Sequence, residues 1–280
     1  MINLNGDLLQ AREAAISPDH RAFRYGDGVF ETMLFNRGVI HFWEDHYFRL
    51  MAAMRILRME IPMNFSPEFF EEQIESTLEA NGIKNEMARV RLQVSRGGSG
   101  FYLPDSSANV DFLIQVDQLE GMPYSASAGL SIDIFKDHLK PRQLLSGIKS
   151  TNSAIYIIAA IWAKENRVDD ALLLNEKKEV VESVRSNLFL VSEDQNQLIT
   201  PPEDSGCLKG IMRKQLVRLA PKMGLEVVEK AVSPFDLLRV KEIWLCNSIH
   251  GVQWVDRYRK NSYTGDLANK MNVMLRAQFI

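Results

Sequence analysis

The amino-acid sequence predicts an α+β fold with two domains. Stretches typical of strands and of helices are mixed along the 280 residues without a regular alternation, which disfavours a doubly wound parallel sheet. The chain has no Gly-x-Gly-x-x-Gly motif and no Walker-type lysine loop, which weakens a nucleotide-binding interpretation. At roughly 150 residues per domain, the length favours two domains.

The first part of the chain predicts strands and helices that follow one another. Apolar and polar residues alternate strictly from Ala88 to Ser95, which indicates a strand with one buried face. Ser66 and Pro67 supply an N-cap and a first-turn proline, and Asn81-Gly82 is a typical helix end. Asn36-Arg37-Gly38 predicts the turn of a β-hairpin. The expected strands are 29–35, 39–42, 88–95 and 109–116, and the expected helices are 44–57 and the stretch from Pro67 to Asn81.

The pattern changes after Gly121-Met122-Pro123. We therefore predict an N-terminal α/β domain at 1–118, an interdomain linker at 119–126, and a C-terminal domain at 127–280. The expected strands of the second domain are 130–135, 171–174, 188–192 and 242–246, and its expected helices are 152–166, one that opens at Gly210 and one from about Gly265.

Charge and composition exclude some classes of partner. Lys plus Arg number 33 and Asp plus Glu 36, so the net charge of −3 gives no basic excess for nucleic acid or an anionic membrane surface. The longest apolar run, Ala154 to Ala163, is about half a membrane-spanning helix. Residues 1–7 do not resemble a secretory signal, so we expect a cytoplasmic protein. Cys207 and Cys246 suggest neither a disulfide framework nor a metal site.

Lys149 lies between a glycine turn and the start of an apolar helix, in the segment Ser146-Gly147-Ile148-Lys149-Ser150-Thr151-Asn152. A lysine that is partly desolvated has a lowered pKa, and its neutral amine is suited to forming a Schiff base with a carbonyl compound. Taken alone, however, the segment is more typical of a solvated loop lysine.

Three further segments could carry chemistry. Glu182 follows two valines directly before an expected strand, so it is either a solvated strand end or a buried carboxylate that accepts a hydrogen bond from a protonated ring nitrogen. Gly210 opens a helix whose free backbone N–H groups could hold a phosphate, although glycine is common at helix starts. The segment Tyr25-Gly26-Asp27-Gly28 by itself predicts only a turn that enters a strand.

Taken together and in order, these segments resemble the class IV, or fold-type IV, pyridoxal-phosphate enzymes. That family includes branched-chain and D-amino-acid aminotransferases and aminodeoxychorismate lyase. The resemblance implies a smaller N-terminal domain, a larger C-terminal domain that binds pyridoxal 5′-phosphate, and a homodimer. It covers nearly the whole chain through Arg21–Leu50, Gly147–Asn152, Asp170–Leu174, Glu182, Asn187–Phe189, Thr200-Pro201, Gly210–Arg213 and Leu245–Ser248.

The resemblance implies a set of cofactor contacts. Lys149 matches the lysine that forms a Schiff base with pyridoxal phosphate and later moves the substrate proton. Glu182 matches the carboxylate that pairs with the pyridine nitrogen and keeps it protonated. Arg49 matches the arginine that clamps the phosphate, a task suited to its forked donors. Further phosphate contacts would come from the backbone of Ile211 and Met212 and the hydroxyl of Ser248.

The substrate contacts that the resemblance implies are Tyr25, Phe30 and Arg96. Tyr25 and Phe30 match positions that line the substrate side in aminotransferases of the family. Arg96 ends the alternating strand, where it would either bind the substrate carboxylate or form an ordinary strand-end ion pair.

The resemblance predicts an aminotransferase that moves an amino group between a branched-chain-like amino acid and a 2-oxo acid. The alternative is aminodeoxychorismate lyase, which releases pyruvate and 4-aminobenzoate, and a third is a non-catalytic binding protein of the same fold. Many branched-chain enzymes read Gly-Asn-Tyr after the lysine, whereas this chain has Thr151-Asn152-Ser153. Trp254 replaces a proline common to both branches, so the chain matches neither cleanly.

Overall fold

The computed structural model describes residues 1–107, 109–125 and 128–279. They form two compact units, Met1–Met122 with Ile148–Asn152, and Pro123–Gly147 with Ser153–Ile280. Each unit contains both sheet and helix, which confirms the expected α+β class. The limits 1–118, 119–126 and 127–280 stay a prediction about the functional division of the chain, and their end points 126, 127 and 280 lie outside the described residues.

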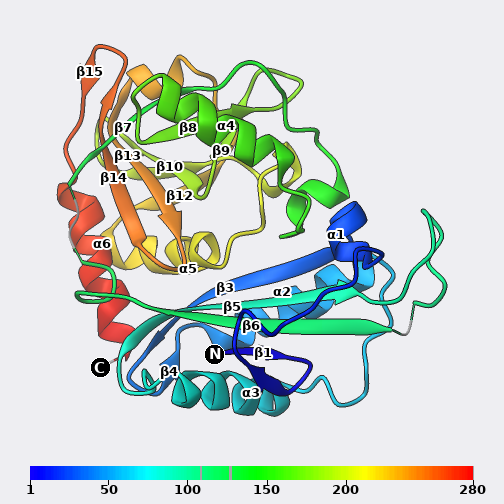
Figure 1. Ribbon diagram of the computed structural model, residues 1–280. Coiled ribbons are helices and arrows are strands. Elements are labelled where there is room, and N and C mark those ends of the chain that lie inside the picture. Colours follow the sequence, from blue (N-terminus) through cyan, green and yellow to red (C-terminus); the bar gives the residue numbers. More distant parts are fainter. Residues whose placement is uncertain (108, 126–127, 280) are drawn as a thin grey trace. The chain divides into compact units, whose positions relative to one another are not determined.

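The first unit is built on one antiparallel sheet with strand order β2-β1-β6-β5-β3-β4 (Figure 1). The predicted hairpin is confirmed as β3 and β4, and the alternating segment is confirmed as β5, which pairs with β3 and β6. The strands are β1 Ile2–Leu4, β2 Asp7–Leu9, β3 Gly28–Asn36, β4 Val39–Ile40, β5 Met87–Arg96 and β6 Val110–Gln118, and the helices are α1 Arg21–Tyr25, α2 Trp43–Ile56 and α3 Pro67–Ala80.

Helices α2 and α3 cover one face of this sheet, because their apolar residues share a single buried core with β3, β5 and β6. On β5 the alternation places Val90, Leu92 and Val94 in that core, while Arg91 and Gln93 lie on the opposite face. The predicted cap of α3 is confirmed, since the Ser66 side chain accepts a hydrogen bond from the Phe69 N–H at 3.1 Å.

The short segment Ile148–Asn152 is attached to β3 of the first unit, although its chain neighbours on both sides belong to the second. Ser150 forms a bridge with Val29, and the Phe30 N–H donates to the Lys149 carbonyl at 2.9 Å. The Thr151 N–H donates to the Gly28 carbonyl at 2.9 Å. The backbone of Lys149 is therefore held in register by a strand more than a hundred residues away in sequence.

The second unit contains a nine-stranded sheet with the order β12-β11-β10-β13-β14-β7-β8-β9, and β15 beside β14. A further pairing between β9 and β10 closes part of this order into a ring (Figure 1). The strands are β7 Leu130–Ile134, β8 Asp170–Leu174, β9 Val180–Ser183, β10 Asn187–Ser192, β11 Gln197–Thr200, β12 Glu226–Glu229, β13 Val240–Asn247, β14 Gly251–Tyr258 and β15 Asn261–Ser262, and the helices are α4 Ala154–Glu165, α5 Ile211–Leu219 and α6 Asp266–Arg276.

The helices of the second unit each pack on a strand: α4 on β8, α5 on β13 and α6 on β14. The strands expected at 130–135, 171–174, 188–192 and 242–246 and the three expected helices are present within about two residues of their predicted limits. Strand β14 was not predicted, because its polar and apolar residues follow no clear period. Among the described residues, no helix has the length and apolar character needed to cross a membrane.

Candidate functional site

The buried carboxylate of Glu182 is the centre of a polar cluster in the second unit. Glu182 lies on the fully buried strand β9 and is only 3% exposed, so the solvated strand-end interpretation is wrong. Its Oε1 accepts hydrogen bonds from the Lys140 ammonium and, at 2.7 Å, from the Tyr156 hydroxyl. Its Oε2 accepts the backbone N–H of Leu208 at 2.7 Å. The charge of the carboxylate is thus balanced by one buried cation and stabilised by two neutral donors.

The N-terminus of α5 lies three residues after Leu208. Gly210 is the N-cap, and within the described residues no side chain caps the helix. A Cβ at Gly210 would lie 1.8 Å from Asn187 Oδ1, so only glycine fits here. The N–H groups of Ile211 and Met212 in the first turn are donors of the kind that bind an anion.

Ser248 follows β13 in a tight turn, where it is half-buried. Asn247 shapes that turn, because its Oδ1 accepts the N–H groups of Ile249 at 3.0 Å and His250 at 2.9 Å. The hydroxyl of Ser248 is therefore carried by a hydrogen-bonded turn at the end of a buried strand.

Lys149 lies beside an aromatic ring in the first unit. Its Nζ is 4.6 Å from the centroid of the Phe30 ring. The guanidinium carbon of Arg91 is 3.7 Å from the same centroid, and Arg91 Nη2 donates to Gln93 Oε1 at 2.9 Å. Among the described residues no carboxylate forms an ion pair with Arg91. Phe30 thus contacts two cations, a primary amine and a guanidinium that keeps capacity for an anion.

Arg49 belongs to a buried charge cluster between α2 and β3. Its Nε donates to Glu31 Oε1 at 2.7 Å and its Nη2 to Glu31 Oε2 at 2.5 Å, a bidentate pair. His46 Nδ1 lies 2.6 Å from Glu31 Oε2. Burial by itself raises the pKa of Glu31, but the charges of Arg49 and His46 outweigh this and hold it at about 2. The carboxylate is therefore ionised at neutral pH and fixes the direction of the guanidinium.

Arg96 is fully engaged by the protein. Its Nε donates to Asp27 Oδ2 at 2.9 Å, its Nη1 to the Arg58 carbonyl at 3.2 Å and its Nη2 to the Leu57 carbonyl at 2.5 Å. Only 8% of the side chain is exposed. This arrangement favours the strand-end ion pair over the substrate contact as the role of Arg96.

Tyr25, on the short helix α1, packs against charged and aromatic neighbours of its own unit. The guanidinium carbons of Arg21 and Arg24 lie 5.1 and 5.4 Å from its ring centroid, and the Tyr102 ring centroid is 5.7 Å away. Arg21 also donates to the carbonyl oxygens of residues 99–102, so one buried side chain organises this loop.

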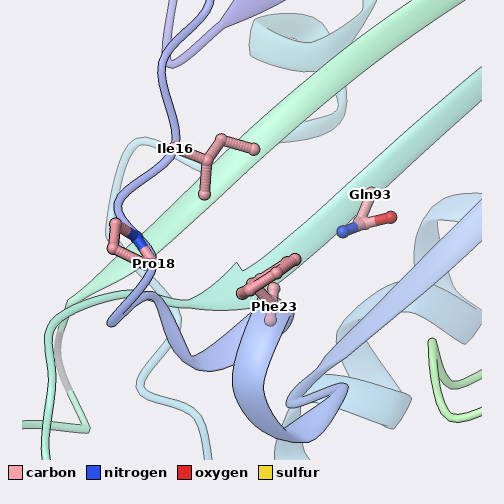
Figure 2. Close-up of a pocket in the computed structure, with 5 residues that line it drawn as sticks. Ile16, Pro18, Phe23 and Gln93 are labelled. Carbon is pink, nitrogen blue, oxygen red and sulfur yellow. The ribbon is translucent and has the colours of Figure 1, made fainter.

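A small apolar pocket lies on the same sheet face as Arg91. Figure 2 shows Phe23 of α1 and the coil residues Ile16 and Pro18 around Gln93 of β5. The pocket volume is about 360 Å³. Because Gln93 is hydrogen bonded to Arg91, the pocket and the open guanidinium are adjacent features of one face.

Sequence analysis missed Lys140, Tyr156, Glu31, His46 and Arg91. Arg91 and His46 each had a usable signal, since Arg91 occupies a polar position of the alternating strand and His46 is three residues before Arg49. The others form contacts between residues 15 to 42 positions apart, which no local pattern reveals. Metal-ligand clusters of His, Cys, Asp or Glu are absent from the described part of the chain.

A family model and several known proteins match this chain. The family model "Amino-transferase class IV" matches residues 28–258. A Methanocaldococcus jannaschii protein with a provisional branched-chain-amino-acid aminotransferase name is 30% identical over 275 residues, covering 96% of this chain and 93% of the relative. Aminodeoxychorismate lyase of Bacillus subtilis is 29% identical over 259 residues, covering 89% of this chain and 83% of the relative.

The fold is also that of solved fold-type IV proteins, as the sequence predicts. The structure of a hypothetical aminotransferase from Mycobacterium tuberculosis in its pyridoxal-phosphate-bound form has a TM-score of 0.84 with this chain at 22% identity. The similarity covers all of this chain and 99% of the other. The chain therefore belongs to the class IV aminotransferase family, whose members are pyridoxal-phosphate-dependent enzymes.

Proposed function

We propose that this protein is an aminotransferase that binds pyridoxal 5′-phosphate and moves the amino group of a branched-chain-like amino acid to a 2-oxo acid. The observation that carries the proposal is the pair of cations at Phe30. The Lys149 amine and the Arg91 guanidinium contact the same ring. An α-amino acid needs one group that handles protons at its Cα and one that holds its carboxylate.

The donors of the two units fit pyridoxal phosphate. Glu182 is a buried carboxylate, the type of acceptor that a protonated ring nitrogen requires. Arg49 has the forked donors that suit phosphate oxygens, and no side chain of the described residues makes a capping hydrogen bond at the N-terminus of α5. Lys149 supplies a primary amine for the aldehyde. We therefore assign the phosphate to Arg49, Ile211, Met212 and Ser248, and the ring nitrogen to Glu182.

Bound pyridoxal phosphate would withdraw electrons from the substrate Cα and so make its proton removable. The work of the chain is then to position and to transfer that proton. Lys149 Nζ would take the proton from Cα and return it, and the hydrogen bonds from β3 to residues 149–151 fix where that amine starts. Glu182 would keep the ring nitrogen protonated. Phe30 and Tyr25 would limit the space around the substrate side chain.

Reconstitution tests this function directly. The purified chain is mixed with pyridoxal phosphate, reduced with borohydride and digested, and the peptide that carries the added cofactor mass is expected to contain Lys149. The Lys149→Ala variant should lose both this label and turnover, whereas Lys84→Ala, a change at a half-exposed surface lysine of the same unit, should keep both. A label at another lysine, or turnover without Lys149, contradicts the proposal.

Aminodeoxychorismate lyase is the second candidate. It is supported by the 29% identity to the Bacillus subtilis lyase and by the residues Thr151-Asn152-Ser153 after the lysine. The two reactions differ in a single turnover. An aminotransferase converts an amino acid alone to its 2-oxo acid and keeps the nitrogen. A lyase releases pyruvate from aminodeoxychorismate without an amino acceptor.

We also propose a homodimer in the cytoplasm. Apolar side chains are exposed in each unit: Ile157 and Ile161 of α4 are 58% and 53% exposed, and Phe23 and Phe101 are each 76% exposed. Ile157 and Ile161 lie one turn apart on α4, and adjoining exposed apolar side chains are typical of protein interfaces. Light scattering on the purified protein should give twice the mass of the 31.9 kDa chain; a monomer at all concentrations would contradict the dimer.

A further inference from the structure

We propose that Lys140 and Tyr156 are positioning residues that orient Glu182, with Lys140 supplying its counter-charge and Oε2 left to meet the ring nitrogen of the cofactor. The inference rests on the proposed function, because it concerns how the cofactor's partner is held. Neither residue belongs to the set of contacts that the resemblance implies. All the contacts that carry the inference lie within the second unit.

The two carboxylate oxygens of Glu182 have different surroundings. Oε1 accepts from both Lys140 and Tyr156, and Oε2 accepts only from the Leu208 N–H. A carboxylate has about four acceptor positions, two on each oxygen. Oε1 is therefore filled by the protein, whereas Oε2 keeps one acceptor position for another donor. Because the three donors come from three separate segments, the carboxylate plane is fixed as well.

Lys140 is held in place for this task. It is 4% exposed, its backbone N–H donates to the Leu174 carbonyl at 2.8 Å, and it forms a bridge with Asn175 at the end of β8. Among the described residues, Glu182 is the only carboxylate in ion-pair contact with it. A buried ammonium and a buried carboxylate are each costly alone and tolerable as a pair. Lys140 and Glu182 thus form a charge-compensated pair within the protein.

Tyr156 contributes a donor without a charge. It lies in the first turn of α4, and burial, followed by the nearby Glu182 carboxylate, raises the pKa of its phenol, which stays protonated. Cys207 is a further titratable neighbour, and burial likewise raises the pKa of its thiol. Arg213 also lies near Cys207, but the carboxylates with which it pairs among the described residues are Glu203 and Glu229. Lys140 is therefore the cation that compensates the negative charge of Glu182 in this cluster.

The counter-charge can be tested by removing it. In Lys140→Met the cofactor-free protein would contain an uncompensated buried carboxylate, whereas in the loaded protein the protonated ring nitrogen would replace the lost cation. We therefore expect Lys140→Met to lower the melting temperature of the cofactor-free protein by several degrees more than that of the loaded protein. Lys140→Arg should restore the wild-type difference. Tyr156→Phe should lower both forms by similar amounts, because it removes a donor but no charge.

The pH dependence adds a second readout that needs no cofactor. Without Lys140, the carboxylate of Glu182 would be buried without a counter-charge, and burial favours the neutral, protonated carboxyl group in the folded state. Stability of cofactor-free Lys140→Met should then fall as the pH rises from about 5 to 8. The double variant Lys140→Met/Glu182→Gln should lose this slope, since it has no carboxylate to ionise.

The outcomes separate this inference from the proposed function. If wild-type protein binds no pyridoxal phosphate, the proposed function fails, and the pH slope of the cofactor-free variants still tests the charge pair. If wild-type protein binds the cofactor but Lys140→Met destabilises both forms equally and shows no pH slope, Lys140 is merely structural and the inference is overturned.

Discussion

The two units each bury a glutamate beside a cation, but the surroundings of the two carboxylates differ. Glu31 takes a bidentate guanidinium and an imidazole, and both partners lie on the adjacent helix α2. Glu182 takes an ammonium, a phenol and a backbone N–H, and each comes from a different part of the chain. In the first case the carboxylate orients an arginine, and in the second the protein orients the carboxylate.

This difference teaches how the role of a buried charge can be inferred from its partners. Both carboxylate oxygens of Glu31 accept hydrogen bonds from Arg49, so this carboxylate serves to hold the guanidinium in one orientation. Glu182 instead receives the Lys140 ammonium and the Tyr156 hydroxyl on Oε1 and a single backbone N–H on Oε2, so Oε2 keeps one acceptor position for another donor. Two of the three arginines of β5 repeat the contrast, because Arg96 is committed to three protein acceptors and Arg91 is not.

The largest expected effect is that of Glu182→Gln. The change removes the acceptor for the ring nitrogen and leaves Lys140 buried without a counter-charge. Losing one member of a buried pair costs about 3–5 kcal/mol in the free energy of unfolding. Losing the charged hydrogen bond to the ring nitrogen costs about 1.5–3 kcal/mol, so turnover should also fall roughly 10- to 100-fold. Steady-state kinetics on the loaded enzyme measure it. The matched change Glu193→Gln, on an exposed loop, should leave turnover intact. A fully active Glu182→Gln enzyme would contradict the role that distinguishes Glu182 from Glu31.

Glu31→Gln should act on stability and cofactor affinity more than on chemistry. It leaves Arg49 and His46 without their shared carboxylate, and a loss of about 3–5 kcal/mol in the free energy of unfolding is expected. Denaturant unfolding measures that loss, and fluorescence titration with pyridoxal phosphate measures the weaker binding. A variant as stable as the wild type would show that the cluster does not compensate its charges as the contacts indicate.

The free energy of unfolding at acidic pH should also depend on Glu31. Its pKa is about 2 in the folded protein against 4.5 for the free side chain, so its contribution is complete above about pH 4.5 and is lost as the pH falls toward 2. The shift corresponds to about 3 kcal/mol. Unfolding curves collected from pH 5 to pH 2 should therefore be flatter for Glu31→Gln than for the wild type. Parallel curves would contradict the depressed pKa.

Arg91→Gln and Arg96→Gln sharpen the comparison within one strand. Losing a charged hydrogen bond to a substrate carboxylate costs about 1.5–3 kcal/mol, so Arg91→Gln should raise KM roughly 10- to 100-fold with little change in melting temperature. Arg96→Gln should lower the melting temperature and leave KM nearly unchanged, because its partners are Asp27 and two backbone carbonyls. The reversed pattern would return the substrate role to Arg96.

The smallest effect is expected at Arg89, also on β5. It pairs with Asp117 at 2.7 Å, but both side chains are more than half exposed, and such pairs contribute about 0–1 kcal/mol. Arg89→Gln should therefore change neither KM nor the unfolding midpoint beyond this range. A larger effect would mean that the exposed end of the strand also takes part in the site.

The sequence predicts those helices and strands whose hydrophobic pattern extends over enough residues to be recognised. Strand β5 and helix α3 appear nearly as expected, since each has a full run of alternating or capped positions. The elements that were not predicted are mostly strands of two to four residues, such as β11, β12 and β15, which are too short to show a period. Strand β14 is longer but alternates irregularly around Trp254.

The site divides in the same way. Lys149, Glu182 and Arg49 could be singled out because they stand in ordered motifs of a known family. Lys140 could not, because a single lysine in a polar segment is usually solvated, and its burial depends on β8 and β9 meeting it from far along the chain. The burial of Glu182 and the commitment of Arg96 required the same long-range information.

The place of residues 148–152 limits how this protein can be taken apart. A fragment that ends at Met122 would contain β3 without the lysine that is hydrogen bonded to it, and the complementary fragment would contain the lysine without its template. Neither fragment alone would keep the backbone hydrogen bonds that join β3 to residues 149–151. A chimera that keeps the first unit intact therefore needs joints on both sides of residues 148–152 as well as after Met122.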